Sequence, residues 1–254
     1  MKIFAAAMIL LVLFNSHSFL MRMQYAPGWN REFQHLLFYF DLPVLIIYAL
    51  LFIMTDRCIR AHGFSAYQKI SLALGGVLTF IGVFLHMVRS LAYAEGAMQP
   101  PSAFIEILDY VIFSGLSSLG MLAYIFNDII NTIIQQGPAA FFIFNILLPV
   151  FFGGCSGLFF GILVRSKRDV LPVLLAFAGY IVYSGGFFSF REHIFLASGR
   201  SERGAFPDHE LYYQYSSIAE QSLIMGILGL IIFVTSLILF HRMLKSYTGG
   251  KPKA

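Results

Sequence analysis

Hydrophobic residues in this chain are gathered into long runs, and polar residues fall mainly between them. A helix needs about 20 apolar residues to cross the hydrocarbon of a bilayer, and seven runs approach or exceed that length. Each run is therefore predicted to be a membrane-spanning helix. The runs comprise residues 3–20, 37–55, 70–93, 104–127, 139–164, 170–189 and 218–241.

The pattern within the runs excludes a membrane β-barrel, because barrel strands alternate apolar and polar residues and these runs do not. Backbone N–H and C=O groups in lipid must then be satisfied inside each segment, which a helix achieves. The sequence predicts an all-α, polytopic transmembrane bundle that forms one domain over residues 1–254. It has about seven spans, or six if the first run is a cleaved signal or one run is re-entrant.

Most predicted connections between the runs are short. Pro100–Pro101 and Gly137–Pro138 mark two of them, and a charged stretch at residues 165–169 marks a third. The exception is a predicted long loop over residues 190–217, which is rich in charged residues and histidines. Tyrosines at its end favour the headgroup layer of the membrane, and a loop that grips a ligand is the alternative.

Composition supports a membrane protein: 58% of the residues are hydrophobic and 12% are charged, against about a quarter charged in soluble domains. The net charge of +4 does not indicate a nucleic-acid partner, because the basic residues cluster between the apolar runs. We expect the bilayer as partner, in a bacterial-type inner membrane or a plasma membrane, with other membrane subunits or further copies of the chain as additional candidates. Cys58 and Cys155 lack a CxxC spacing and are interpreted as free thiols.

Basic residues give a weak orientation for a bundle of seven spans. One side carries ten Lys and Arg residues and the other carries seven, which favours placing the first side in the cytoplasm. The first side comprises the loops near 21–36, 94–103 and 165–169 together with the C-terminal tail. However, the loop over residues 56–69 is itself basic and favours the opposite orientation. A re-entrant 104–127 segment, which carries Glu106 and Asp109, is one way to account for this conflict.

Ionisable residues near one end of the second, third and fourth predicted helices form a candidate polar site. His86 and Arg89 lie three residues apart and therefore share a helix face, as do Glu106 and Asp109. Ionisable groups near hydrocarbon usually face the bundle interior and pair with one another, so we predict that Arg89 pairs with one of these carboxylates. The whole cluster comprises His35, Asp41, His86, Arg89, Glu106 and Asp109.

This cluster has three interpretations. The residues lie in the headgroup layer, where charge costs little; or they relay protons; or the imidazoles and carboxylates bind a metal. The sequence has no ligand spacing such as HExxH, so no metal site is assigned. No cofactor is indicated either, because a haem needs histidines that face each other and only His86 is well placed.

A second candidate is Ser156 in the segment GGCSGLFFG at residues 153–161. Together with Trp29 and the segment REFQHLL at residues 31–37, it resembles the rhomboid intramembrane serine proteases. The resemblance implies a serine nucleophile paired with a histidine on a late helix. The predicted helices 170–189 and 218–241 carry no histidine in their interiors, since His241 lies at an end, so the base is missing.

The oxyanion residues of that family are also missing, because Val44 and Tyr48 lie near the expected positions of a histidine and an asparagine. Gly153, Gly157 and Gly161 offer a simpler interpretation. They follow a GxxxGxxxG spacing, which places small residues on one face and lets another helix approach closely. Helix packing is therefore the first prediction for this segment.

The sequence as a whole favours a non-enzymatic membrane protein, either a small transporter-like protein or a membrane subunit of a complex. The alternative is an intramembrane enzyme. It would be a rhomboid-like hydrolase around Ser156 or a metal-dependent enzyme that uses His35, His86 and carboxylates.

Overall fold

A computed structural model gives the fold of the chain. It describes residues 3, 6–11, 13, 31–94, 111–113, 115–116, 137–199 and 209–248. These residues are almost entirely helical and include no strand, which confirms the prediction of an all-α chain for this part of it. The predicted spans 3–20 and 104–127 lie largely outside the described residues, so the total of seven spans stays a prediction.

The helices extend at both ends beyond the runs 37–55, 70–93, 170–189 and 218–241, whereas the helix of the run 139–164 ends earlier, at Gly161. Four of them contain stretches that are long and apolar enough to cross a membrane, namely Ala66–Leu85, Pro138–Gly161, Lys167–Phe190 and Tyr213–Arg242. These stretches indicate a membrane protein. The elements are α2 (Arg31–His62), α3 (Ala66–Ala94), α6 (Pro138–Phe142), the π-helical turn η1 (Ile143–Leu147), α7 (Leu148–Gly161), α8 (Lys167–Gly199) and α9 (His209–Thr248).

The predicted long loop over residues 190–217 is wrong for all of its described residues. Helix α8 continues to Gly199 and helix α9 begins at His209. Hydropathy marks only the part of a helix that lies in lipid, whereas intrahelical hydrogen bonds continue wherever the backbone stays helical. The polar residues of this segment therefore extend two helices, and the connection between them is confined to residues 200–208.

The turns between consecutive helices are closed by specific backbone and side-chain contacts. Gly63 follows α2 with a positive φ of 73° and donates its N–H to Ile59 O, 2.7 Å away, as a glycine C-cap does. Ser65 and Gln68 then form a capping box at the start of α3, each side chain accepting a hydrogen bond from the other residue's backbone N–H. These caps close the short turn that joins α2 to α3.

The junction between α7 and α8 is held by a buried carboxylate. Asp169 Oδ2 accepts hydrogen bonds from the backbone N–H groups of Arg165 and Ser166, at 3.0 and 2.9 Å. It also accepts one from the Ser166 hydroxyl, at 3.1 Å. A carboxylate in the first turn of a helix also interacts favourably with the helix dipole. Asp169 thereby determines where α8 begins.

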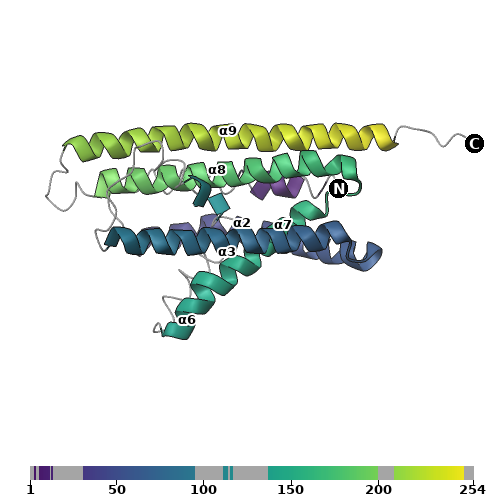
Figure 1. Cartoon of the computed structure of the whole chain (residues 1–254), viewed down its shortest axis with the longest axis horizontal. Helices are drawn as coiled ribbons and strands as arrows, with labels where there is room; N and C mark the ends of the chain where they lie inside the picture. The colour runs from purple at the N-terminus through teal and green to yellow at the C-terminus, as the bar shows by residue number, and fades with distance from the viewer. Residues whose placement is uncertain are drawn as a thin grey trace, which may run out of the picture.

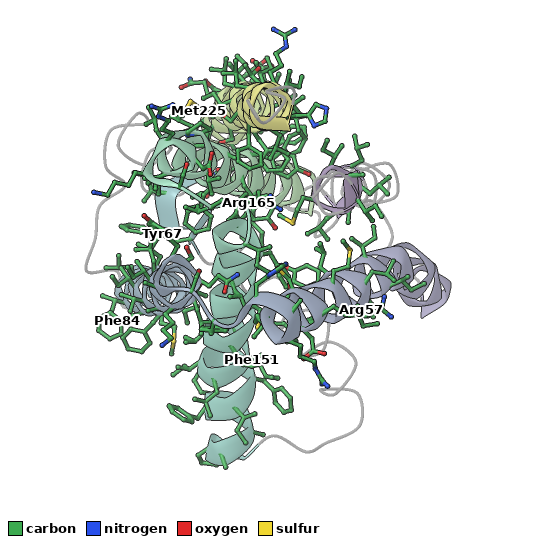
Figure 2. All side chains as sticks on the ribbon, turned by 90° about the vertical axis from the view of Figure 1, so that its right-hand side faces the viewer. Arg57, Tyr67, Phe84, Phe151, Arg165 and Met225 are labelled. Carbon is green, nitrogen blue, oxygen red and sulfur yellow. The ribbon has the colours of Figure 1, made fainter. Side chains whose placement is uncertain are left out.

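Glycines bring the helices together as two close, antiparallel pairs. In the first pair, α7 packs on α3, with Gly161 beside Gln68 and Gly153 beside Thr79. In the second pair, Gly179 and Gly186 of α8 contact α9. Figure 2 looks along the bundle and shows α9 and α8 stacked at the top, with α7 descending between α3 and α2. Small residues at these crossings allow the close backbone approach on which dispersion contacts depend.

Aromatic side chains fill the space between the two pairs. The Phe160 ring of α7 lies 5.1 Å from that of Phe177, 5.8 Å from that of Tyr180 and 6.2 Å from that of Phe233, measured between centroids. Large apolar side chains also cover the outside, as at Leu171, which is 65% exposed. In water such a surface would be unfavourable, but in lipid it is solvated.

The antiparallel pairs define two ends of the bundle. One end contains the α2–α3 turn, the α7–α8 junction and the C-terminal end of α9. The opposite end contains the last turns of α3 and α8 and the first turns of α9. Figure 1 shows the two ends at the right and at the left of the long axis, and the contacts of Gly161 with α3 and of Gly179 with α9 require the same arrangement.

Candidate functional site

The predicted polar cluster is only partly within the described structure. His35 and Asp41 belong to the first half of α2, and His86 and Arg89 belong to the last turns of α3. The positions of these four side chains, and Glu106 and Asp109 entirely, lie outside the described residues. The end of α3 lies at the opposite end of the bundle from the α2–α3 turn (Figure 1). Convergence of these side chains on one site remains a prediction.

A buried polar network at that same end was not identified from the sequence. It joins α8 to α9 through Ser189, His193 and Ser222, which are all 1% exposed or less. The Ser189 and Ser222 hydroxyl oxygens lie 2.8 Å apart. The His193 Nδ1 lies 2.7 Å from the Ser189 carbonyl oxygen and 3.3 Å from the Ser189 hydroxyl oxygen. The ring of Tyr215 on α9 lies 6.0 Å from the imidazole.

These distances assign the proton of the imidazole. A carbonyl oxygen can only accept a hydrogen bond, so Nδ1 carries a hydrogen and donates it to Ser189. The Ser189 hydroxyl oxygen accepts a second, weaker hydrogen bond from the same N–H group. The Ser189 O–H can in turn donate to the hydroxyl oxygen of Ser222. The result is a chain of groups from helix to helix, in which the imidazole and both hydroxyls can each give and receive a proton.

The sequence contains a signal for this network that hydropathy alone does not reveal. Ser189 and His193 are separated by four residues, which places them on the same face of a helix. Hydropathy places His193 in a loop, where this spacing has no meaning. Once α8 is continued to Gly199, His193 falls on a helix that packs against α9.

The second sequence candidate, Ser156, lies in the packed interior of the bundle. It is 2% exposed, and its hydroxyl oxygen lies 2.8 Å from the hydroxyl oxygen of Tyr48 on α2. The Tyr48 ring in turn contacts Phe152 and Phe159 of α7, at centroid distances of 6.5 and 5.7 Å. This hydrogen bond and these ring contacts join α2 to α7.

The hydrogen bond with Tyr48 does not activate Ser156 as a nucleophile. A serine nucleophile needs a base that can take its proton, whereas a tyrosine hydroxyl stays protonated at neutral pH. The neighbouring glycines of the motif contact α3, since a Cβ on Gly157 would lie 3.0 Å from Gly75 Cα and one on Gly161 would lie 3.3 Å from Gln68 Cα. The segment that resembles rhomboid proteases thus lies at the crossing of α7 with α2 and α3.

The described side chains offer no candidate metal centre. No group of three or more histidines, cysteines, aspartates or glutamates suited to a metal ion occurs among them. Cys58 and Cys155 are free thiols, as predicted. The predicted metal alternative rests on His35 and His86, whose side chains belong to the part of the chain outside this description.

Comparison of the chain with protein-family models, curated proteins and solved structures finds no match. Evidence for its function therefore comes from its own residues and their arrangement.

Proposed function

We propose that this chain is a small transporter-like membrane protein in which Ser189, His193 and Ser222 form part of a polar path between α8 and α9. The observation that carries the proposal is the buried imidazole of His193, which Ser189 holds on α8, three residues beyond the stretch Lys167–Phe190 that is long and apolar enough to cross a membrane. Ionisable groups inside a membrane bundle are costly, and they mark proton relays and solute pathways.

The chemistry of the network suits protons and small solutes that form hydrogen bonds. Its groups are neutral hydroxyls and one imidazole, so they stabilise a passing proton or polar group without a fixed buried charge. The network also lies at the end of the bundle to which the last turns of α3 bring His86 and Arg89. Proton-coupled movement of a small polar solute is the activity that this arrangement supports best.

Proton flux in reconstituted vesicles tests the proposal. Vesicles that contain the full chain and a trapped pH-sensitive dye should lose an imposed pH gradient faster than protein-free vesicles. The His193→Ala variant should lose it at the protein-free rate, because the chain of proton-exchanging groups is cut. His241→Ala is the matched control, since His241 is an exposed histidine near the other end of α9, and it should keep the wild-type rate.

Two results would contradict a transporter. One is wild-type protein that leaves the gradient unchanged, and the other is a His193→Ala variant that is folded and as fast as the wild type. Circular dichroism and gel filtration of each variant separate loss of function from loss of fold.

A second function, as a membrane subunit of a complex, is favoured by the segment formed by α6 and η1. None of its residues is buried, and Figure 2 shows it extending away from the other helices. The only strongly polar side chain in it, Asn145, donates to Phe141 O at 2.9 Å within the same helix. A photocrosslinking residue at Phe142 should capture a protein chain in native membranes if this function holds. Crosslinks to lipid only would exclude it.

A further inference from the structure

Basic side chains gather at the end of the bundle that contains the α2–α3 turn, the α7–α8 junction and the C-terminal end of α9. All the Lys and Arg side chains that the structure describes at this end are exposed. The single exposed carboxylate described among them, Asp56, is engaged by Arg60 at 2.9 Å, and Asp169 is buried against backbone N–H groups. The basic end comprises Arg57, Arg60, Lys69, Arg165, Lys167, Arg168 and Arg242.

The opposite end of the bundle has a different balance of charged residues. Among the described helices, it contains three arginines, four glutamates and no lysine. The arginines and glutamates are Arg31, Arg89, Arg191, Glu32, Glu192, Glu210 and Glu220. The charge asymmetry therefore follows the long axis of the bundle. It was hidden in the sequence because a count over seven alternating spans assigns the 56–69 and 165–169 connections to opposite sides.

We propose that the basic end faces the cytoplasm and binds the anionic headgroups of phospholipids in that leaflet. Connections rich in Lys and Arg are retained on the cytoplasmic side. That leaflet is negatively charged, and each Lys or Arg near its surface strengthens association by about fivefold. The seven exposed cations come from the α2–α3 turn, the α7–α8 junction and the C-terminal part of α9, so segments distant in the sequence contribute to one basic end.

Labelling of single cysteines from outside the cell tests the orientation. In a background with Cys58→Ala, we place Ala61→Cys at the basic end and Tyr213→Cys at the opposite end, where both parent side chains are exposed. A membrane-impermeant maleimide should label Tyr213→Cys in intact cells, and Ala61→Cys only after permeabilisation. Labelling of Ala61→Cys in intact cells would overturn the proposal.

Lipid binding is tested on the purified full chain in neutral micelles. Fluorescent phosphatidylglycerol should bind more tightly than fluorescent phosphatidylcholine. The double variant Lys167→Gln, Arg168→Gln should weaken phosphatidylglycerol binding by about 25-fold, from about fivefold per cation, and Arg191→Gln at the other end should not. Equal binding of the two lipids would overturn the lipid assignment, and so would displacement of phosphatidylglycerol by inorganic phosphate, which would assign the cluster to free phosphate.

Discussion

Replacing Gly75 with alanine is expected to lower the free energy of unfolding by about 1–3 kcal/mol, the usual cost of an extra methyl group in a packed interior. Gly75 lies where α3 crosses α7, and a Cβ there would meet Gly157 Cα at 3.0 Å. Because the obstacle is backbone, it cannot rotate away, and α3 must move from α7. Reversible unfolding in mixed micelles, followed by circular dichroism, measures the effect.

The neighbouring glycine provides the control for this prediction. A Cβ on Gly76 would find its nearest atom, Val150 O, at 3.7 Å, which is ordinary contact. Gly76→Ala should therefore leave stability unchanged or raise it by up to about 1 kcal/mol, since alanine favours helix over glycine. Equal effects of the two alanines would show that the α3–α7 crossing is not close-packed as described.

Phe160→Ala is expected to destabilise the protein by about 3–5 kcal/mol, as large-to-small changes of buried aromatic residues do. Phe160 is 2% exposed and its ring touches Phe177 and Tyr180 of α8 and Phe233 of α9. Removing the ring leaves a cavity between the two helix pairs, so dispersion contacts with both partners are lost. The same unfolding assay measures the loss.

Phe84→Ala is the matched control for Phe160→Ala. Phe84 is 55% exposed on the outer face of α3, as Figure 2 shows, and it stacks on Phe80 of the same helix. Its loss should change stability by less than about 0.5 kcal/mol, as surface changes usually do. If Phe84→Ala cost as much as Phe160→Ala, the interior and the lipid-facing surface would have been assigned the wrong way round.

The helices were predictable from the sequence because lipid leaves the backbone little choice. Hydropathy located α3 and α7 within a few residues, and the spacing of Gly153, Gly157 and Gly161 gave the face of α7 that packs on another helix. It did not identify α3 as the partner, since contacts between distant segments are not encoded in the period of one helix.

The buried network was not predictable by the same reasoning. Ser189 and His193 look like loop residues when hydropathy alone decides where a helix ends, and their partner Ser222 lies 33 residues beyond Ser189. The charge asymmetry between the two ends is not evident from the sequence for a related reason. Counting charges over seven alternating spans separates Arg57 from Arg165, whereas the antiparallel packing of α3 on α7 places both at one end.

Ser156 shows how a short motif can be ambiguous. Small residues around a serine are required both for a nucleophile that is closely approached by substrate and for helices that cross at short distance. The hydrogen bond between Ser156 and Tyr48 and the contacts of Gly157 with α3 favour the second reason. A motif of this kind indicates chemistry only when its base is also present.

Spin labels on the outer faces of the helices test most directly that the bundle lies in lipid. Two suitable positions are Val77 on α3 and Ile231 on α9, whose side chains are 56% and 55% exposed. In reconstituted membranes, nitroxides at these positions should collide more often with oxygen than with a water-soluble nickel complex. A label at Lys167, in the basic end, should show the reverse. More frequent collisions with the nickel complex at Val77 and Ile231 would contradict a membrane-spanning bundle.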